Sequence, residues 1–277
     1  MKKIIYSTFK DLPLTLSFYE SNLANSNKPA IIYFHGGGLI FGHRDDLPES
    51  YIHSFTQSGY PFISIDYVLA PEAKLDQIFL SISHFFQWFE ENHMHILHLQ
   101  SNEKILFGRS SGAYLALQWA KRIKVNAVIA FYGYHSLFHN EFLLPSHNFQ
   151  KYPSLSETLV SKSIQKKPMV KTDLQRYLLY VFFRQSGTWV KNLTDVPKQL
   201  DTYSLTAHDL KNLPPTFLAA SRSDEDVPYS FSQLMSRLIP KSNLLTFDNL
   251  PHDFDREVKG EASQESYRKL LLWLDNL

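Results

Sequence analysis

The chain of 277 residues contains no cysteine, only 10 glycines and a formal net charge of +1. Without cysteine it has no disulfide, no thiol nucleophile and no cysteine-ligated metal site. A charge so close to zero provides no field that would attract a polyanion, so we expect no nucleic-acid partner. No apolar run reaches the length of a membrane span, about 18 residues, and early polar residues interrupt any signal peptide. We therefore expect a cytoplasmic protein that binds a small molecule.

The few glycines are concentrated in two short segments. Residues 35–38 read HGGG and residues 108–112 read GRSSG, and together they hold five of the 10 glycines. Each segment follows an apolar run typical of a buried strand. The second segment matches G-x-S-x-G, in which a serine occupies a sharp turn between a strand and a helix. Glycine is needed on both sides because side chains there would collide. The pattern predicts that Ser110 is a nucleophile, with a merely flexible turn as the alternative.

The first glycine segment can supply a second part of such a site. When a nucleophile attacks a carbonyl group, negative charge develops on one oxygen, and closely spaced N–H groups stabilise it. The backbone of Gly36 and Gly37 can approach that oxygen because no side chain intervenes. The N–H of Ser111, at the start of the next helix, is a third donor aided by the helix dipole. We predict that Gly36, Gly37 and Ser111 form an oxyanion hole.

The base and the acid are predicted from their order along the chain. In sites of this type the nucleophile comes first, then the acid, then the histidine. The chain has 12 histidines, but His252 is the only one after Asp209, and it follows the last strand-like run. Asp224 follows another such run and can orient the imidazole. Asp226 is the alternative acid, and we favour Asp224 because Asp226 is also placed to cap the next helix.

The order of apolar segments predicts the fold. Two runs at residues 3–9 and 13–19 indicate an antiparallel hairpin. Later strand-like runs alternate with helix-like segments, which is typical of a mostly parallel sheet with helices on both faces. We therefore predict a single α/β domain over residues 1–277. Its other strands are expected at residues 30–34, 61–67, 104–107, 127–132, 216–220 and 243–247, and its helices at residues 75–89, 114–121 and 266–274.

The segment from about residue 135 to residue 201 interrupts this alternation. It shows no strand pattern and is too long for a loop in a compact domain. A capping-box pattern at residues 172–175 and an apolar run ended by Gly187 predict a helix within it. We expect this insertion to form a helical cap over the carboxyl ends of the strands. Its lysines either form a positive rim for anionic substrates or are simply solvated; they are Lys162, Lys166, Lys167 and Lys171.

These motifs resemble the α/β-hydrolase superfamily, in particular carboxylesterases similar to hormone-sensitive lipase and the related feruloyl and acetyl esterases. The matching positions are residues 35–38, 66–72, 108–112, 224 and 252–254, in the family's order. The resemblance implies the α/β-hydrolase fold and hydrolysis of a carboxylic ester without cofactor or metal. It also implies that Asp66 and Glu72 support the loops near the glycine turn. Arg109 and Ser111 stand where the family usually has an acidic residue and alanine.

The expected activity is that of a serine hydrolase that cleaves short-chain acyl or small aromatic esters through an acyl-enzyme intermediate. The turn at Ser110 does not discriminate between leaving groups. The alternative is therefore an amide or peptide hydrolase on the same fold, related to acyl-peptide hydrolases and arylformamidases. A non-catalytic ligand-binding protein is disfavoured because a nucleophile, a base and an acid are all present. The expected partner is a small-molecule ester, and the sequence leaves a monomer and a homodimer both open.

Overall fold

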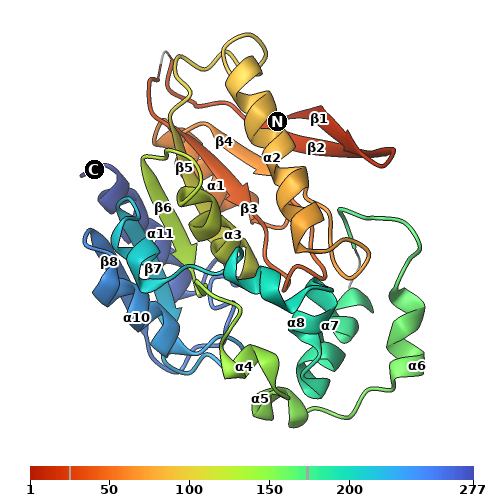
Figure 1. Cartoon of the computed structure of the whole chain (residues 1–277). Coiled ribbons are helices and arrows are strands. Elements are labelled where there is room, and N and C mark those ends of the chain that lie inside the picture. The colour runs from red at the N-terminus through yellow and green to blue at the C-terminus, as the bar shows by residue number, and fades with distance from the viewer. Residues whose placement is uncertain (25, 173–174) are drawn as a thin grey trace.

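Eight strands form one sheet in the computed structural model, which describes residues 1–24, 26–172 and 175–277 (Figure 1). The strand order is β1-β2-β4-β3-β5-β6-β7-β8. The β1/β2 and β2/β4 pairs are antiparallel, and all the other neighbours are parallel. The strands are β1 (Lys2–Phe9), β2 (Leu12–Tyr19), β3 (Ala30–Phe34), β4 (Phe62–Ile65), β5 (Lys104–Arg109), β6 (Ala127–Phe131), β7 (Thr216–Ser221) and β8 (Ser242–Phe247). The predicted mostly parallel sheet with an N-terminal hairpin is confirmed.

Side chains of the central strands pack into two separate cores, one on each face of the sheet. In β3, Ile32 and Phe34 belong to one core, whereas Ile31 and Tyr33 belong to the other, because successive strand residues point to opposite faces. The first core is covered by α2 (Leu75–Asn92), α3 (Ser111–Ala120) and α10 (Tyr229–Leu238), and the second by α1 (Glu49–Gln57) and α11 (Glu261–Leu274). A further short helix, α9 (Ala207–Lys211), precedes β7.

Some helix bounds differ from the sequence prediction. α3 begins at Ser111 and α11 at Glu261, both earlier than predicted, because the residues that precede the predicted starts at 114 and 266 include no large apolar side chain to signal a helix. The prediction misses α1 altogether. Its buried Tyr51, Ile52 and Phe55 have the spacing of an amphipathic helix, and that signal could have found it. No helix in the described part of the chain is long and apolar enough to cross a bilayer.

The cap segment, residues 135–201, contains helices and no strand among its described residues. Figure 1 shows these helices grouped at the end of the sheet toward which the parallel strands point. α7 (Gln175–Ser186) ends before Gly187, whose φ of +67° suits glycine, as predicted. Residues 173 and 174 of the predicted capping box lie outside the described residues. The helices are α4 (Asn140–Leu143), α5 (His147–Gln150), α6 (Glu157–Val160), η1 (Ser161–Ser163), α7 (Gln175–Ser186), α8 (Trp189–Leu193) and η2 (Pro197–Asp201).

Two buried ion pairs join α7 to loops that follow the strands. Arg176, near the start of α7, pairs with Glu72, which follows β4, at 2.6 Å. Arg184, near its end, pairs with Asp226, which follows β7, at 2.7 Å. Both loops lie at the carboxyl ends of their strands, where α/β proteins build their sites. The division of the chain into one domain with a cap insertion stays a prediction.

Candidate active site

Ser110 occupies the turn between β5 and α3, which we call the nucleophile elbow (residues 108–112). Its φ of +54° and ψ of −121° place it in a strained conformation that non-glycine residues rarely adopt. The elbow needs its two glycines. A Cβ on Gly108 would overlap the backbone of Gly112, and one on Gly112 would overlap the carbonyl of Phe34. The strain at Ser110 is therefore held in place by close packing of backbone on backbone.

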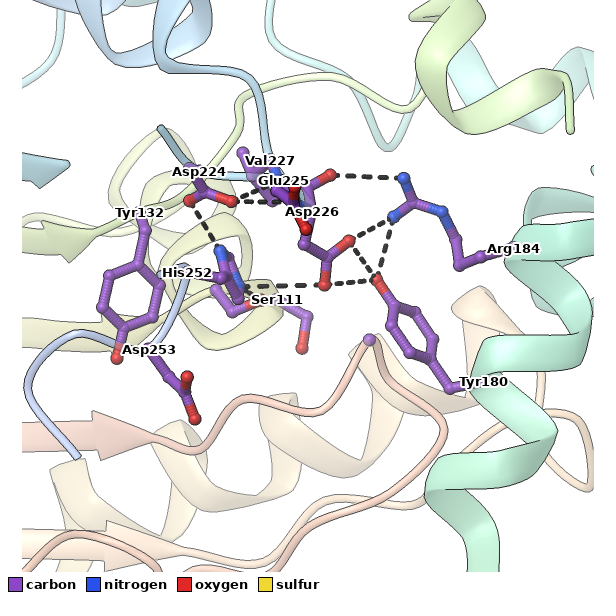
Figure 2. Close-up of polar contacts among 12 residues, drawn as sticks. Ser111, Tyr132, Tyr180, Arg184, Asp224, Glu225, Asp226, Val227, His252 and Asp253 are labelled. Carbon is purple, nitrogen blue, oxygen red and sulfur yellow. Dashed lines mark hydrogen bonds and ion pairs between the residues drawn. The ribbon is translucent and has the colours of Figure 1, made fainter. Parts of the chain in front are cut away.

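His252 lies between Ser110 and Asp224. Its Nε2 is 2.8 Å from Oγ of Ser110, and its Nδ1 is 2.7 Å from Oδ2 of Asp224. A carboxylate can only accept, so Nδ1 carries the proton and a neutral imidazole offers Nε2 as the acceptor. Oδ1 of Asp224 accepts hydrogen bonds from the N–H groups of Asp226 and Val227, both at 2.9 Å. Three residues far apart in the sequence thus form a continuous hydrogen-bonded chain, part of which is drawn in Figure 2.

Asp226 has a different place from the one the sequence suggests. The residue at the N-cap of α10 is Pro228, so capping by Asp226 was the wrong expectation. Its carboxylate turns toward the cap segment, where it accepts hydrogen bonds from Tyr180 and Arg184 at 2.7 Å each (Figure 2). Its Oδ2 also lies 3.9 Å from Nε2 of His252. Two neighbouring carboxylates therefore flank the imidazole, Asp224 at Nδ1 and Asp226 near Nε2.

The glycine turn, residues 35–38, packs against the nucleophile elbow. A Cβ on Gly36 would lie 3.4 Å from Cβ of Ser110, and Gly37 has a φ of +106°, which favours glycine. Oγ of Ser111 accepts a hydrogen bond from the N–H of Leu39 at 3.2 Å, which ties the two segments together. Within the described residues, no hydrogen bond is donated by the N–H groups of Gly36, Gly37 or Ser111. These three donors remain available to a ligand.

Arg109, within the nucleophile elbow, ties the elbow to other loops through buried ion pairs, a role that the sequence does not indicate. Its buried guanidinium pairs with Asp46 at 2.9 Å and with the fully buried Asp255 at 3.5 Å. Asp255 also accepts a hydrogen bond from the hydroxyl of Tyr132 at 2.6 Å. The ring of Tyr132 in turn packs against His252, with centroids 4.7 Å apart. This network connects the elbow to the loop that carries the imidazole.

Carboxylates surround His252 and change its affinity for protons. Burial lowers the pKa of the imidazole, but the nearby charges of Asp224, Asp226 and Asp253 outweigh burial and raise the pKa from 6.5 to about 9. The imidazolium form is thus stabilised in the folded protein. A site that generates positive charge on this ring during reaction would benefit from the same carboxylates.

A pocket of about 800 Å³ opens above Ser110 and His252. Asp224 lies behind the imidazole and does not line the pocket. Asp66 and Glu72, predicted to support nearby loops rather than to act in catalysis, also lie outside the lining and bind Arg44 and Arg176, at 2.6 Å each. None of the four cap lysines lines it either, so of the two interpretations of these lysines, a positive rim does not apply to this pocket. Five aromatic side chains form one wall of it, and we call them the aromatic wall: Phe41, Phe149, Tyr152, Tyr177 and Tyr180.

Comparison with known proteins agrees with this architecture. A sequence model of the α/β-hydrolase fold matches residues 31–254. The chain belongs to the α/β-hydrolase fold family. The probable carboxylesterase M8 of Phoma sp. is 25% identical to it, over 91% of this chain and 89% of that protein. The predicted family and fold are confirmed.

Two solved structures are similar to this chain in both sequence and fold. A protein of unknown function from Staphylococcus aureus is 31% identical, with a TM-score of 0.90 over 100% of this chain and 99% of that one. An α/β-hydrolase superfamily protein from Enterococcus faecalis is 31% identical, with a TM-score of 0.81 over 96% of each chain.

Proposed function

We propose that the protein is a serine esterase that hydrolyses carboxylic esters through an acyl-enzyme. The observation that carries the proposal is the pair of contacts made by His252, at 2.8 Å to Ser110 and 2.7 Å to Asp224. In this geometry a neutral imidazole can remove the proton of Ser110 as its Oγ attacks a carbonyl carbon. The similarity to a carboxylesterase along most of the chain supports an ester as the substrate.

The site contains a nucleophile, a base and hydrogen-bond donors for each step of the proposed reaction. Oγ of Ser110 forms a bond to the acyl carbon, and the resulting oxyanion is stabilised by the N–H groups of Gly36, Gly37 and Ser111. The bond to the alcohol oxygen then breaks, and Nε2 of His252 gives its proton to that oxygen. Water, deprotonated by the same nitrogen, attacks the acyl-enzyme and releases the acid. Asp224 holds Nδ1–H in place and stabilises the imidazolium.

We propose short-chain acyl or small aromatic esters as the substrates. Its volume of about 800 Å³ suits a small molecule. The ring of Tyr180 lies directly on Gly38, so that a Cβ on this glycine would overlap the ring. This contact narrows the space beside the glycine turn, and we propose that it limits the size of the acyl group. Action without cofactor, a cytoplasmic location and a monomeric or homodimeric state remain predictions from the sequence.

The test is hydrolysis of p-nitrophenyl acetate by the Ser110→Ala variant. We expect loss of turnover and of labelling by a fluorophosphonate, with thermal unfolding unchanged. Ser83→Ala, which removes the hydroxyl of a serine on α2 outside the pocket, is the matched control and should keep full activity. If Ser110→Ala retained turnover, Ser110 would not be the nucleophile. A faster reaction on the matching anilide than on the ester would replace the esterase assignment with an amidase.

A further inference from the structure

Asp226 lies beside Nε2 of His252, the imidazole nitrogen that protonates the leaving group in the proposed reaction. Its Oδ2 is 3.9 Å from Nε2 of His252, which is itself 2.8 Å from Oγ of Ser110. In the proposed reaction Nε2 gives a proton to the departing alcohol oxygen, which must therefore come within about 3 Å of it. The alcohol oxygen of a substrate must therefore approach the nitrogen of His252 beside which Asp226 lies.

The carboxylate of Asp226 is fixed in place but keeps a free face toward the pocket. Arg184 and Tyr180 bind its Oδ1, and Tyr180 is the only described donor to its Oδ2. Arg184 does not line the pocket, whereas Asp226 does. The guanidinium instead lies within 5.0–5.7 Å of four ring centroids in the cap segment. A ligand in the pocket can therefore contact the carboxylate of Asp226, whereas the guanidinium of Arg184, which pairs with that carboxylate, lies outside the pocket lining.

The remaining charged groups of the pocket add to this negative character. Its lining includes four carboxylates and two guanidinium groups. Of the two guanidinium groups, Arg109 is buried and paired with Asp46 and Asp255. Arg256 is largely exposed and pairs with Asp253 at 3.2 Å. The lining thus holds two more carboxylates than guanidinium groups, while Glu225 and Asp226 have their cationic partners, Lys151 and Arg184, outside the lining, and the imidazolium of His252 offsets one negative charge.

The aromatic wall provides a second attraction for positive charge, although Arg184 already lies over two of its rings, Phe149 and Tyr180. Its rings follow one another with centroid distances of 5.5–6.2 Å, from Tyr152 through Phe149, Tyr180 and Phe41 to Tyr177. The faces of such rings attract cations, and quaternary ammonium groups are bound in this way. Tyr180 belongs both to this wall and to the group that holds Asp226. Rings and carboxylate thus act on the same region of the pocket.

We propose that the pocket selects esters whose alcohol portion carries a positive charge, such as an amino alcohol or a quaternary ammonium alcohol. Asp226 and the aromatic wall are the specificity determinants. The inference rests on the proposed esterase reaction and adds no step to it. Acyl transfer to Ser110 breaks the bond to the cationic alcohol, whose oxygen takes the proton from His252, and water then releases the acid.

The test compares three acetate esters of similar size. They are 2-(trimethylammonio)ethyl acetate, its neutral isostere 3,3-dimethylbutyl acetate, and the anionic 4-acetoxybutanoate, all followed by pH-stat titration. The wild type should prefer the cationic over the neutral ester in kcat/KM by about tenfold, and hydrolyse the anionic ester most slowly. Asp226→Asn should remove most of that preference, measured as the ratio of kcat/KM for the cationic ester to kcat/KM for the neutral ester, so that a change in the basicity of His252 affects both esters alike and cancels. Asn keeps an oxygen that can accept from Tyr180 and Arg184.

Two further variants complete the design. Asp275→Asn, the same change at an exposed carboxylate paired with Lys28, should leave the preference unaltered. Tyr177→Leu, which removes a partly exposed ring of the aromatic wall, should lower the preference without affecting folding. Equal kcat/KM for the cationic and neutral esters, or a preference that survives Asp226→Asn, would overturn the specificity alone. If the wild type hydrolyses p-nitrophenyl acetate but none of these three esters, the specificity alone is overturned. If it does not hydrolyse p-nitrophenyl acetate either, the esterase function fails and this inference fails with it.

Discussion

Replacing Asp224 by Asn should disable the imidazole by fixing it in the wrong tautomer. The two N–H groups that bind Oδ1 of Asp224, from Asp226 and Val227, require an acceptor at that position. An Asn must therefore turn its oxygen toward them and its NH₂ toward Nδ1 of His252. Nδ1 then has to accept, so the ring proton moves to Nε2, which can no longer take the proton of Ser110. The loss should be roughly 10⁴-fold in kcat, or about 5 kcal/mol of transition-state stabilisation.

The assay is steady-state hydrolysis of p-nitrophenyl acetate, with active sites counted by fluorophosphonate labelling. Asp226→Asn is the matched variant, because it makes the same change two residues away. It should reduce turnover of this neutral ester by no more than about tenfold, since Asp226 is 3.9 Å from Nε2 and makes no hydrogen bond to the ring. A loss of three orders of magnitude in Asp226→Asn, with Asp224→Asn less than tenfold impaired, would refute the assignment of the acid.

Two other predictions concern pH and the cap. Because His252 acts as a base in its neutral form and its pKa is raised to about 9, kcat/KM should rise with pH up to about 9. A plateau already reached near pH 7 would contradict this. The shift from 6.5 to about 9 stabilises the folded state below pH 6.5 by about 3 kcal/mol, and urea titrations should show this contribution lost as pH rises through 9. Arg184→Met should lower the free energy of unfolding by about 3 kcal/mol, because it leaves the Asp226 carboxylate without its buried partner. Thermal unfolding checks this, and adding Asp226→Asn should recover part of the loss.

Much of the fold was predictable from local patterns. Buried strands show as short apolar runs because both of their faces are covered, and the structure places a strand at every predicted run. The elbow was predictable because its geometry excludes side chains at residues 108 and 112, which leaves glycine in the sequence. His252 could be chosen by chain order alone, and the structure places it 2.8 Å from Ser110.

Other features depend on distances that no local pattern encodes. Asp224 and Asp226 are two residues apart in one loop, and only the fold shows that one contacts Nδ1 and the other faces α7. The partner of Asp226 is Arg184, 42 residues earlier in the chain. Likewise Arg109 is an unexplained basic residue until Asp46 and Asp255 are seen beside it.

The sequence by itself determined the sheet, the strained serine turn and the glycine turn, because each is dictated by the steric needs and burial of neighbouring residues. The tertiary structure decided which carboxylate serves the imidazole and which charge faces the substrate. Both depend on electrostatic contacts of a few ångströms, among the loops that follow the strands and between them and the cap segment. Residues far apart in the sequence come this close only when the whole chain is folded.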